Sequence, residues 1–295
     1  MEIKGTYTAM ITPFKGGQVD FEGLTKNIHY QLDNGINGLL ALGTTAETPT
    51  LNEDEKISII NLFVEEAGGK VPVVVGTGSN STEHTIENTR KAKELGADVV
   101  LIVTPYYNKP TQNGIFLHFQ AVCDQVDIPI IVYNIQGRTG KNIETSTLKR
   151  IAELPNIIGV KEASGSVDQM ENVIHQIAMK KENFNVMSGD DGLTVPLLSI
   201  GGTGVISVLS NLVPDKVVQM VNAGLKGDFE TAREIHYRLL PLVRAAFIES
   251  NPIPIKAAME MCDMPAGGVR LPLCVIQPKH KELVKEVLAG MNLIK

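Results

Sequence analysis

The chain has 295 residues, of which 43% are hydrophobic and 20% are charged, a balance typical of a globular protein with an ample core. Its formal net charge of −6, with no basic cluster, argues against a nucleic-acid-binding protein. Aromatic residues make up only 5% and Trp is absent, so no aromatic stacking platform is indicated.

Short apolar runs recur along the whole chain and predict β-strands. They end roughly thirty residues apart, the size of one βα unit, and only the last interval is shorter. The predicted strands are Tyr7–Ile11, Gly38–Leu42, Val71–Val75, Val99–Val103, Ile130–Tyr133, Ile157–Lys161, Asn185–Met187 and Val205–Ser207.

Stretches with helical spacing separate these runs, among them Glu53–Ala67, Glu83–Leu95 and Val167–Ile177. Apolar strands that alternate with helices predict a parallel sheet covered on both faces. The number of strands, with no Gly-x-Gly-x-x-Gly in the first unit, favours an α/β fold of the closed (β/α)8 TIM barrel type over an open sheet.

The last part of the chain lacks strand-like runs and predicts helices only. We therefore expect a barrel over residues 1–225 that carries the active site, and a C-terminal helical extension over residues 226–295 that packs on the barrel. The predicted helices are Asp215–Leu225, Asp228–Ile248, Pro254–Met261 and Lys279–Gly290.

Lys161 is the most informative residue at a strand end, where barrel enzymes place their catalytic groups. Burial of an ammonium disfavours its charged form, so the neutral amine becomes accessible and can form a Schiff base with a carbonyl substrate. Tyr133 ends the preceding strand, and the two side chains could converge on one substrate carbon. Taken alone, Lys161 could be a solvated lysine and Tyr133 a core aromatic.

Two further strand ends, and the loop that follows Tyr133, carry groups that suit the same chemistry. Thr44 and Tyr107 offer hydroxyls that could pass a proton onward. Arg138, in a glycine-flanked loop, can grip a carboxylate with two hydrogen bonds, although a surface arginine in a turn is an equal reading. Thr45 follows Gly43 and Thr44, and this segment suits a second carboxylate.

No metal or cofactor is expected. No histidine closes a predicted strand and no His-x-His occurs, which argues against a metal-dependent hydrolase. Asp190 and Asp191 could be metal ligands, but a cap on the helix that starts near Gly192 is the better reading. The glycine cluster at 201–204 could cradle a phosphate, but without a nearby Lys or Arg a tight turn is favoured.

The cysteines and the N-terminal residues favour a cytoplasmic protein. Cys123, Cys262 and Cys274 are odd in number and form no Cys-x-x-Cys, so neither a disulfide framework nor a zinc site is supported. The N-terminus carries early charges and no signal-type apolar stretch. The most apolar region, 193–213, is broken by Pro196 and glycines, so no membrane span is expected.

Taken together, the strand-end motifs resemble the dihydrodipicolinate synthase family of Schiff-base-forming pyruvate aldolases, over essentially the whole chain. The resemblance implies a (β/α)8 barrel that joins pyruvate to L-aspartate 4-semialdehyde in lysine and diaminopimelate biosynthesis. The motifs are Gly43-Thr44-Thr45-Ala46-Glu47, Tyr133-Asn134, Gly137-Arg138-Thr139-Gly140, Val160-Lys161-Glu162-Ala163, Ser188-Gly189-Asp190-Asp191 and Asn251-Pro252-Ile253-Pro254.

The resemblance also implies a role for each site residue. Lys161 would be the Schiff-base lysine, Tyr133 the proton donor and acceptor, and Thr44 and Tyr107 the rest of the proton relay. The family supplies the residue that matches Tyr107 across a subunit interface, which implies a homo-oligomer, usually a tetramer built as a dimer of dimers. The substrate-binding groups would be Thr45 and the backbone at Ile206 for pyruvate, and Arg138 for the semialdehyde carboxylate.

Two departures from the family pattern lie in or beside the motifs given above. Ala46 replaces the more common glycine, and Gln136 replaces proline before Gly137, both small local changes. In the cleft that binds the feedback inhibitor lysine, Asn80 and Tyr106 match, but Lys56 replaces a histidine and His84 an acid. A fixed cation should repel a cationic effector, so weak or absent inhibition by lysine is expected.

Two other readings remain open at this point. A sibling pyruvate aldolase, such as a sialic-acid or sugar-acid lyase, would share Lys161 and Tyr133 but would bind a polyol instead of using Arg138 for a second small carboxylate. A catalytically silent barrel that acts as a sensor or scaffold would not require an amine, a phenol and hydroxyls together at strand ends.

Overall fold

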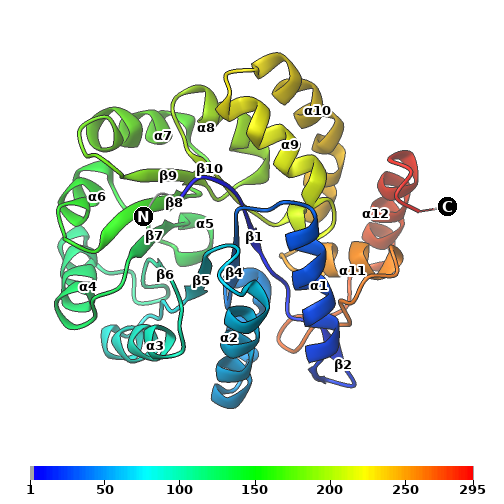
Figure 1. The fold of residues 1–295 in the computed structure, drawn as a ribbon, viewed down its shortest axis with the longest axis horizontal. Helices are drawn as coiled ribbons and strands as arrows, with labels where there is room; N and C mark the ends of the chain where they lie inside the picture. The colour runs from blue at the N-terminus through cyan, green and yellow to red at the C-terminus, as the bar shows by residue number, and fades with distance from the viewer. Residues whose placement is uncertain (1–2, 295) are drawn as a thin grey trace.

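In the computed structural model, which describes residues 3–294, parallel strands close into a barrel (Figure 1). Each strand pairs with its neighbour in the chain, and β1 closes the ring between β4 and β10. The barrel strands are β1 (Gly5–Ala9), β4 (Gly38–Ala41), β5 (Val73–Gly76), β6 (Val99–Val103), β7 (Ile130–Asn134), β8 (Ile157–Glu162), β9 (Asn185–Ser188) and β10 (Gly204–Ser207).

A helix follows each barrel strand, so the expected (β/α)8 architecture is confirmed. These helices form an outer ring around the strands in Figure 1. They are α1 (Phe21–Asp33), α2 (Glu53–Ala67), α3 (Thr82–Glu94), α4 (Gln112–Gln125), α6 (Thr145–Ala152), α7 (Val167–Val173), α8 (Thr194–Ser199) and α9 (Pro214–Leu225); a short helix, α5 (Gln136–Thr139), lies between β7 and α6.

The strands are apolar along their length because both of their faces are buried. Successive residues point to opposite faces of a strand, so Leu40 and Val74 belong to the cluster that fills the barrel interior. Leu39 and Val73, their neighbours, belong to the cluster packed between strands and helices. The same alternation directs Tyr133 to the interior and the residue before it, Val132, to the helices.

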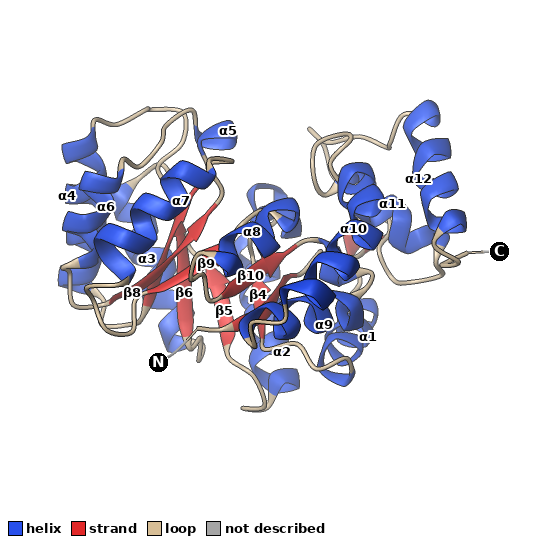
Figure 2. Cartoon of the chain, turned by 90° about the horizontal axis from the view of Figure 1, so that it is seen from above, coloured by secondary structure: helices blue, strands red, loops and turns tan. Residues whose placement is uncertain are grey.

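Three helices follow the barrel: α10 (Phe229–Ala246), α11 (Ile253–Met261) and α12 (Pro278–Gly290). They lie together at one side of the barrel in Figure 2. One cluster of buried apolar residues joins them to the barrel, since it contains residues of β10, α9, α10 and α12 such as Val205, Val217, Leu239 and Leu288. These contacts pack the C-terminal helices against the barrel. The boundary at residue 225 stays a prediction.

Some details differ from the sequence-based expectation. The first strand spans Gly5–Ala9 instead of Tyr7–Ile11, and a small hairpin, β2 (Phe14–Lys15) with β3 (Gln18–Val19), follows it. The helix expected to end at Ile177 is α7, which ends at Val173 and continues as a π-helical turn over Ile174–Ala178.

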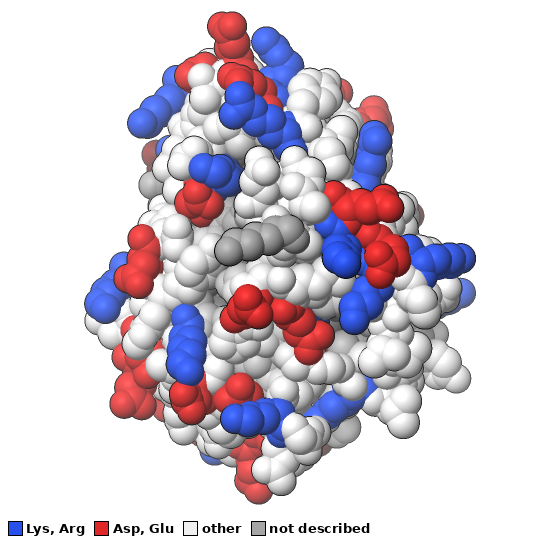
Figure 3. Space-filling view, turned by 90° about the vertical axis from the view of Figure 1, so that its right-hand side faces the viewer, with Lys and Arg blue, Asp and Glu red and all other residues white. Residues whose placement is uncertain are grey.

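Within residues 3–294, none of the helices combines the length and the apolar character that a bilayer crossing needs. Figure 3 shows acidic and basic side chains interspersed on the face that it displays, in keeping with 27 Lys and Arg against 33 Asp and Glu in the sequence.

Candidate active site

Lys161 and Tyr133 face each other at the ends of two adjacent strands. They are partners in the parallel register of β7 and β8. The Nζ atom of Lys161 lies 4.4 Å from the centroid of the Tyr133 ring. Each residue is only 5% exposed, so the amine and the phenol lie close together and are nearly closed off from water.

Burial changes the acidity of the Lys161 amine. It lowers the pKa of Lys161 from 10.5 to about 8, an effect that the charge of Asp191 opposes and that of Arg138 reinforces. At pH 7 roughly one amine in ten is then neutral, compared with fewer than one in a thousand for an ordinary lysine. A neutral amine is the form that attacks a carbonyl carbon.

Burial has the opposite effect on the phenol. It raises the pKa of Tyr133 to about 12, while the charge of Arg138 and a hydrogen bond with the Thr44 side chain act in the other direction. The phenol is therefore protonated at neutral pH. It can donate a proton to a group held in the pocket and recover it when a neighbouring hydroxyl supplies one.

Thr44 and Thr45 lie in a loop that follows β4 as two short 3₁₀ turns, Thr44–Ala46 and Thr48–Thr50. The Thr45 side chain is buried and its Oγ1 accepts a hydrogen bond of 2.9 Å from Nδ2 of Asn251. Because Thr45 is only the acceptor in that bond, its hydroxyl hydrogen is free to donate to a bound anion.

Arg138 lies in α5, at the wall of a second part of the site. Its guanidinium donates a 3.1 Å hydrogen bond to the backbone oxygen of Asn251, which leaves further N–H groups for a ligand. A cavity of about 660 Å³ adjoins it, large enough for a small carboxylic acid. The lining residues are Gly137, Arg138, Phe247, Ile248, Glu249, Ser250 and Asn251.

Asp190 and Asp191 have separate structural roles. Asp190 caps the turn after β9, where its Oδ1 accepts a 2.8 Å hydrogen bond from the backbone N–H of Gly192, as expected. Asp191 is buried and accepts hydrogen bonds from the Ser207 hydroxyl at 2.5 Å and the backbone N–H of Val208 at 2.9 Å. It thereby fixes the end of β10, next to Ile206 in the barrel interior.

The path of the Lys161 side chain leaves room only for a glycine at position 189. A Cβ atom there would lie 2.7 Å from Cβ of Ala163 and 3.0 Å from Cε of Lys161. Any larger residue would therefore press on the chain that carries the amine.

Tyr107 is the one expected site residue that the single chain does not bring to the others. Its side chain is 89% exposed, and its backbone adopts a left-handed conformation with φ of 73°. Among the hydrogen bonds of residues 3–294, none involves its phenol. The single chain thus presents this hydroxyl outward.

The structure adds residues to which the sequence assigned no role. Asn251 contacts both Thr45 and Arg138 through two different groups. Asn134 and Glu162, the residues after Tyr133 and Lys161, are fully buried and hydrogen-bonded to each other at 3.2 Å on the outer side of the strands. The motif that contains Asn251 was visible in the sequence, but its partners lie more than a hundred residues away.

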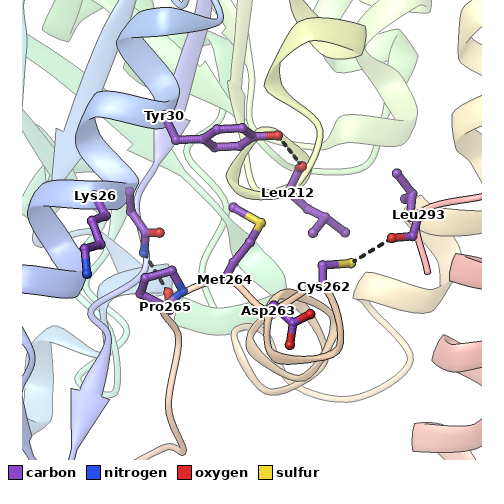
Figure 4. A pocket seen from close by; sticks show the side chains of 9 residues that line it. Lys26, Tyr30, Leu212, Cys262, Asp263, Met264, Pro265 and Leu293 are labelled. Atoms are coloured by element: carbon purple, nitrogen blue, oxygen red, sulfur yellow. Dashed lines mark hydrogen bonds between the residues drawn. The ribbon is translucent and has the colours of Figure 1, made fainter. Parts of the chain in front are cut away.

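A second cavity, of about 400 Å³, lies between α1 and the C-terminal extension (Figure 4). Two of its polar groups are bound to the protein's own backbone: the Tyr30 hydroxyl donates to the oxygen of Leu212 at 3.1 Å, and the Cys262 thiol donates to that of Leu293 at 3.8 Å. Its lining includes none of the predicted site residues.

The glycine cluster at 201–204 forms a close turn instead of a ligand cradle. A Cβ at Gly204 would meet the backbone oxygen of Gly5 at 2.0 Å, and one at Gly202 would meet the Leu197 side chain at 2.4 Å. Over the described residues 3–294, no three His, Cys, Asp or Glu side chains gather in a way that could hold a metal ion.

Comparison with known proteins identifies close relatives. The model of the dihydrodipicolinate synthetase family matches residues 2–290. A 4-hydroxy-tetrahydrodipicolinate synthase of Protochlamydia amoebophila is 54% identical over 289 residues, which cover 98% of this chain and 96% of the relative.

Solved structures agree with this similarity. A dihydrodipicolinate synthase from Thermotoga maritima superposes with a TM-score of 0.98 at 43% identity, and the match covers 100% of both chains. A chloride-inhibited dihydrodipicolinate synthase from Acinetobacter baumannii in complex with pyruvate gives a TM-score of 0.96 at 37% identity, covering 99% of this chain and 100% of the other.

Proposed function

The chain belongs to the dihydrodipicolinate synthetase family, and we propose that it uses Lys161 to join pyruvate to L-aspartate 4-semialdehyde. It is a lyase that forms 4-hydroxy-tetrahydrodipicolinate in lysine and diaminopimelate biosynthesis. The observation that carries this function is the buried amine of Lys161 beside the protonated phenol of Tyr133.

The first half of the reaction is the capture of pyruvate. The neutral Nζ of Lys161 attacks the keto carbon, and the oxygen leaves as water when Tyr133 donates a proton to it. Thr44, hydrogen-bonded to Tyr133, returns a proton to the phenol. The Thr45 hydroxyl and the backbone at Ile206 hold the pyruvate carboxylate.

The second half joins the two substrates. Loss of a methyl proton from the bound pyruvate gives an enamine, whose carbon attacks the aldehyde of the semialdehyde. Arg138 holds the carboxylate of that substrate with charge-assisted hydrogen bonds. The substrate's amino group then attacks the Schiff-base carbon, which closes the ring and frees Lys161.

Trapping of the Schiff base tests the capture step. Borohydride added with pyruvate should reduce the imine and leave a covalent adduct on Lys161 that peptide mass spectrometry locates. Lys161→Arg, which keeps the charge but cannot be deprotonated, is the matched control and should give no adduct. A wild-type chain that turns over without an adduct would remove Lys161 from the mechanism.

Arg138 separates this enzyme from a pyruvate aldolase that takes a polyol. Loss of its guanidinium should raise KM for aspartate semialdehyde by about tenfold or more, because charge-assisted hydrogen bonds are worth about 1.5–3 kcal/mol. Trapping of pyruvate by Arg138→Ala should continue. Unchanged semialdehyde kinetics would assign the carboxylate to another group.

The exposed phenol of Tyr107 supports a homo-oligomer, for which we propose a tetramer built as a dimer of dimers. In that assembly Tyr107 of one subunit completes the proton relay of its partner. In the single chain this side chain is 89% exposed, and its phenol forms no hydrogen bond with the other described residues. Sedimentation of the purified protein measures the size of the assembly.

Complementation tests the exchange of Tyr107 between subunits. Lys161→Ala and Tyr107→Phe should each be impaired alone. When the two are mixed and reassembled, the Tyr107→Phe subunit keeps its lysine and receives a native tyrosine from its partner, so activity should reappear. If no activity returns although mixed dimers form, Tyr107 does not act across the interface.

We place the enzyme in the cytoplasm, which supplies its small-molecule substrates. The free thiols of Cys123, Cys262 and Cys274 suit a reducing compartment. Fractionation of cells followed by the borohydride assay would test this placement.

A further inference from the structure

A buried ion pair joins the C-terminal extension to the loop that carries Thr44 and Thr45, which we call the threonine loop (residues 43–50). Lys256 in α11 donates from Nζ to Oε1 of Glu47 at 2.8 Å, and the two side chains are 2% and 0% exposed. Neither residue belongs to the reaction pathway described above.

Lys256 uses its full donor capacity at this place. Besides Glu47, its Nζ donates to the backbone oxygens of Thr12 at 2.9 Å and Gly268 at 2.5 Å. An ammonium has three N–H groups, so all of them are used. The cation also lies 4.3 Å from the centroid of the Phe14 ring. Its position is therefore fixed from several directions.

Glu47 occupies the point where the threonine loop changes direction. It separates the two 3₁₀ turns and has φ of 56°, a left-handed conformation that costs a residue with a side chain about 1 kcal/mol or more. Its second carboxylate oxygen accepts a 2.9 Å hydrogen bond from the backbone N–H of Arg270, again in the C-terminal extension.

Further hydrogen bonds tie the threonine loop to the rest of the chain. Asn251 holds the hydroxyl of Thr45 at 2.9 Å, and Thr12 donates from Oγ1 to the backbone oxygen of Ala46 at 2.8 Å. Glu47 follows Thr45 by two residues in a tight turn, so a shift of its backbone is transmitted to both threonines.

General stabilisation of the fold is a weaker explanation for this pair. Replacement of a buried ion pair by apolar residues is often neutral or stabilising, so its retention points to a requirement for position. Here one partner lies in the loop that carries two site hydroxyls and the other lies in an element more than two hundred residues away.

We propose that Glu47 and Lys256 are positioning residues, through which the C-terminal extension holds Thr44 against Tyr133 and Thr45 against the pyruvate carboxylate. This inference rests on the proposed function. It predicts a specific kinetic defect when the pair is removed, because Arg138 lies in α5, outside the threonine loop, and should keep its place.

The experiment compares Glu47→Gln, Lys256→Met and the double variant Glu47→Gln/Lys256→Met with the wild type. Each single variant leaves an uncompensated polar group, whereas the double variant removes both charges and should melt closer to the wild type. In the double variant kcat/KM for pyruvate should fall by about tenfold to a hundredfold, since misplacement by about 1 Å can cost that much. KM for aspartate semialdehyde should change by less than about twofold.

Leu288→Ala is the control for lowered stability. Leu288 is fully buried in α12, an element that contributes no residue to the ion pair or to the cavity beside Arg138, so its truncation should lower the melting temperature through a cavity and leave both KM values unchanged. Glu47→Gln, which keeps one acceptor for Lys256, should lie between the wild type and the double variant in kcat/KM for pyruvate.

Two results would overturn the proposal. One is a folded double variant with kcat and pyruvate KM within about twofold of the wild type. The other is an equal kinetic loss in Leu288→Ala. Borohydride trapping separates this inference from the proposed function, because an untrapped wild type defeats the function, whereas a trapped wild type with unaffected variants defeats only the positioning role.

Discussion

At the scale of single residues, the reactivity of Lys161 follows from a balance between burial and two nearby charges. Burial is the largest effect on its pKa, the charge of Asp191 favours the ammonium, and that of Arg138 favours the neutral amine. Arg138 thus acts on the amine by its field as well as on a substrate by its hydrogen bonds. The two charges can be removed one at a time.

The pH dependence of pyruvate capture should show this balance. Because the neutral amine attacks, the rate of borohydride trapping at low pyruvate should rise with pH and level off above about 8, the pKa of Lys161. Asp191→Asn should move this limb to lower pH, and Arg138→Gln should move it to higher pH. Shifts in the same direction, or none, would mean that other groups set the pKa.

The buried amine of Lys161 should also lower the free energy of unfolding of the protein. A pKa lowered from 10.5 to about 8 corresponds to on the order of 3 kcal/mol of lost stability at pH 7. Lys161→Met should therefore be inactive but more stable by up to about that amount. Between pH 8 and 10.5 the unfolded wild type binds more protons than the folded one, so this difference should shrink as pH rises through that range. Denaturant unfolding at pH 7 and pH 10 measures both values.

Residues differ in how far the sequence could predict their roles. Lys161 and Tyr133 were predictable because each ends an apolar run, and adjacent strands of a barrel end side by side. Glu47 and Lys256 were not, since their contact joins segments 209 residues apart and neither segment shows a pattern that pairs it with the other. Tyr107 was assigned from its place beyond a strand end as well as through the family, but the single chain leaves it 89% exposed and away from Lys161.

At the scale of elements, strands were easier to predict than the structure between them. Buried parallel strands are continuous apolar runs, and this is why β6 was predicted from Val99 to Val103 as observed. The first strand was misplaced by two residues because the polar but buried Thr6 belongs to it. The hairpin of β2 and β3 was missed, although Gly16 and Gly17 between the two strands are typical of a tight hairpin turn.

The join between the first and last strands sets a strict limit on side-chain size. A Cβ at Gly204 would lie 2.0 Å from the backbone oxygen of Gly5, its partner in the pairing of β1 with β10. Gly204→Ala should therefore lower the free energy of unfolding by about 1–3 kcal/mol or more, as overpacking does. Gly290→Ala, at an open position at the end of α12, should be neutral or slightly stabilising. Equal midpoints of denaturant unfolding for the two variants would contradict the close approach.

At the scale of the whole molecule, the barrel and its extension form one catalytic unit. The extension contributes Asn251 and Lys256, which contact the threonine loop and Arg138, so the pocket is incomplete without residues from both ends of the chain. In the tetramer that we propose, the outward-facing Tyr107 would complete the site of a neighbouring subunit in the same way.

Control by lysine belongs to this scale, because the resemblance to the family predicts an effector cleft formed by separate elements: Lys56 in α2, Asn80 before α3 and Tyr106 after β6. Lys56 pairs with Glu53 at 2.6 Å, but this partner is exposed and screens the ammonium only in part. We expect lysine at millimolar concentration to leave steady-state activity nearly unchanged. Lys56→His combined with His84→Glu should introduce inhibition, since the change removes a cation and adds an acceptor for the effector's amino group. Strong inhibition of the wild type, or none in the double variant under the same assay, would show that other residues decide the response.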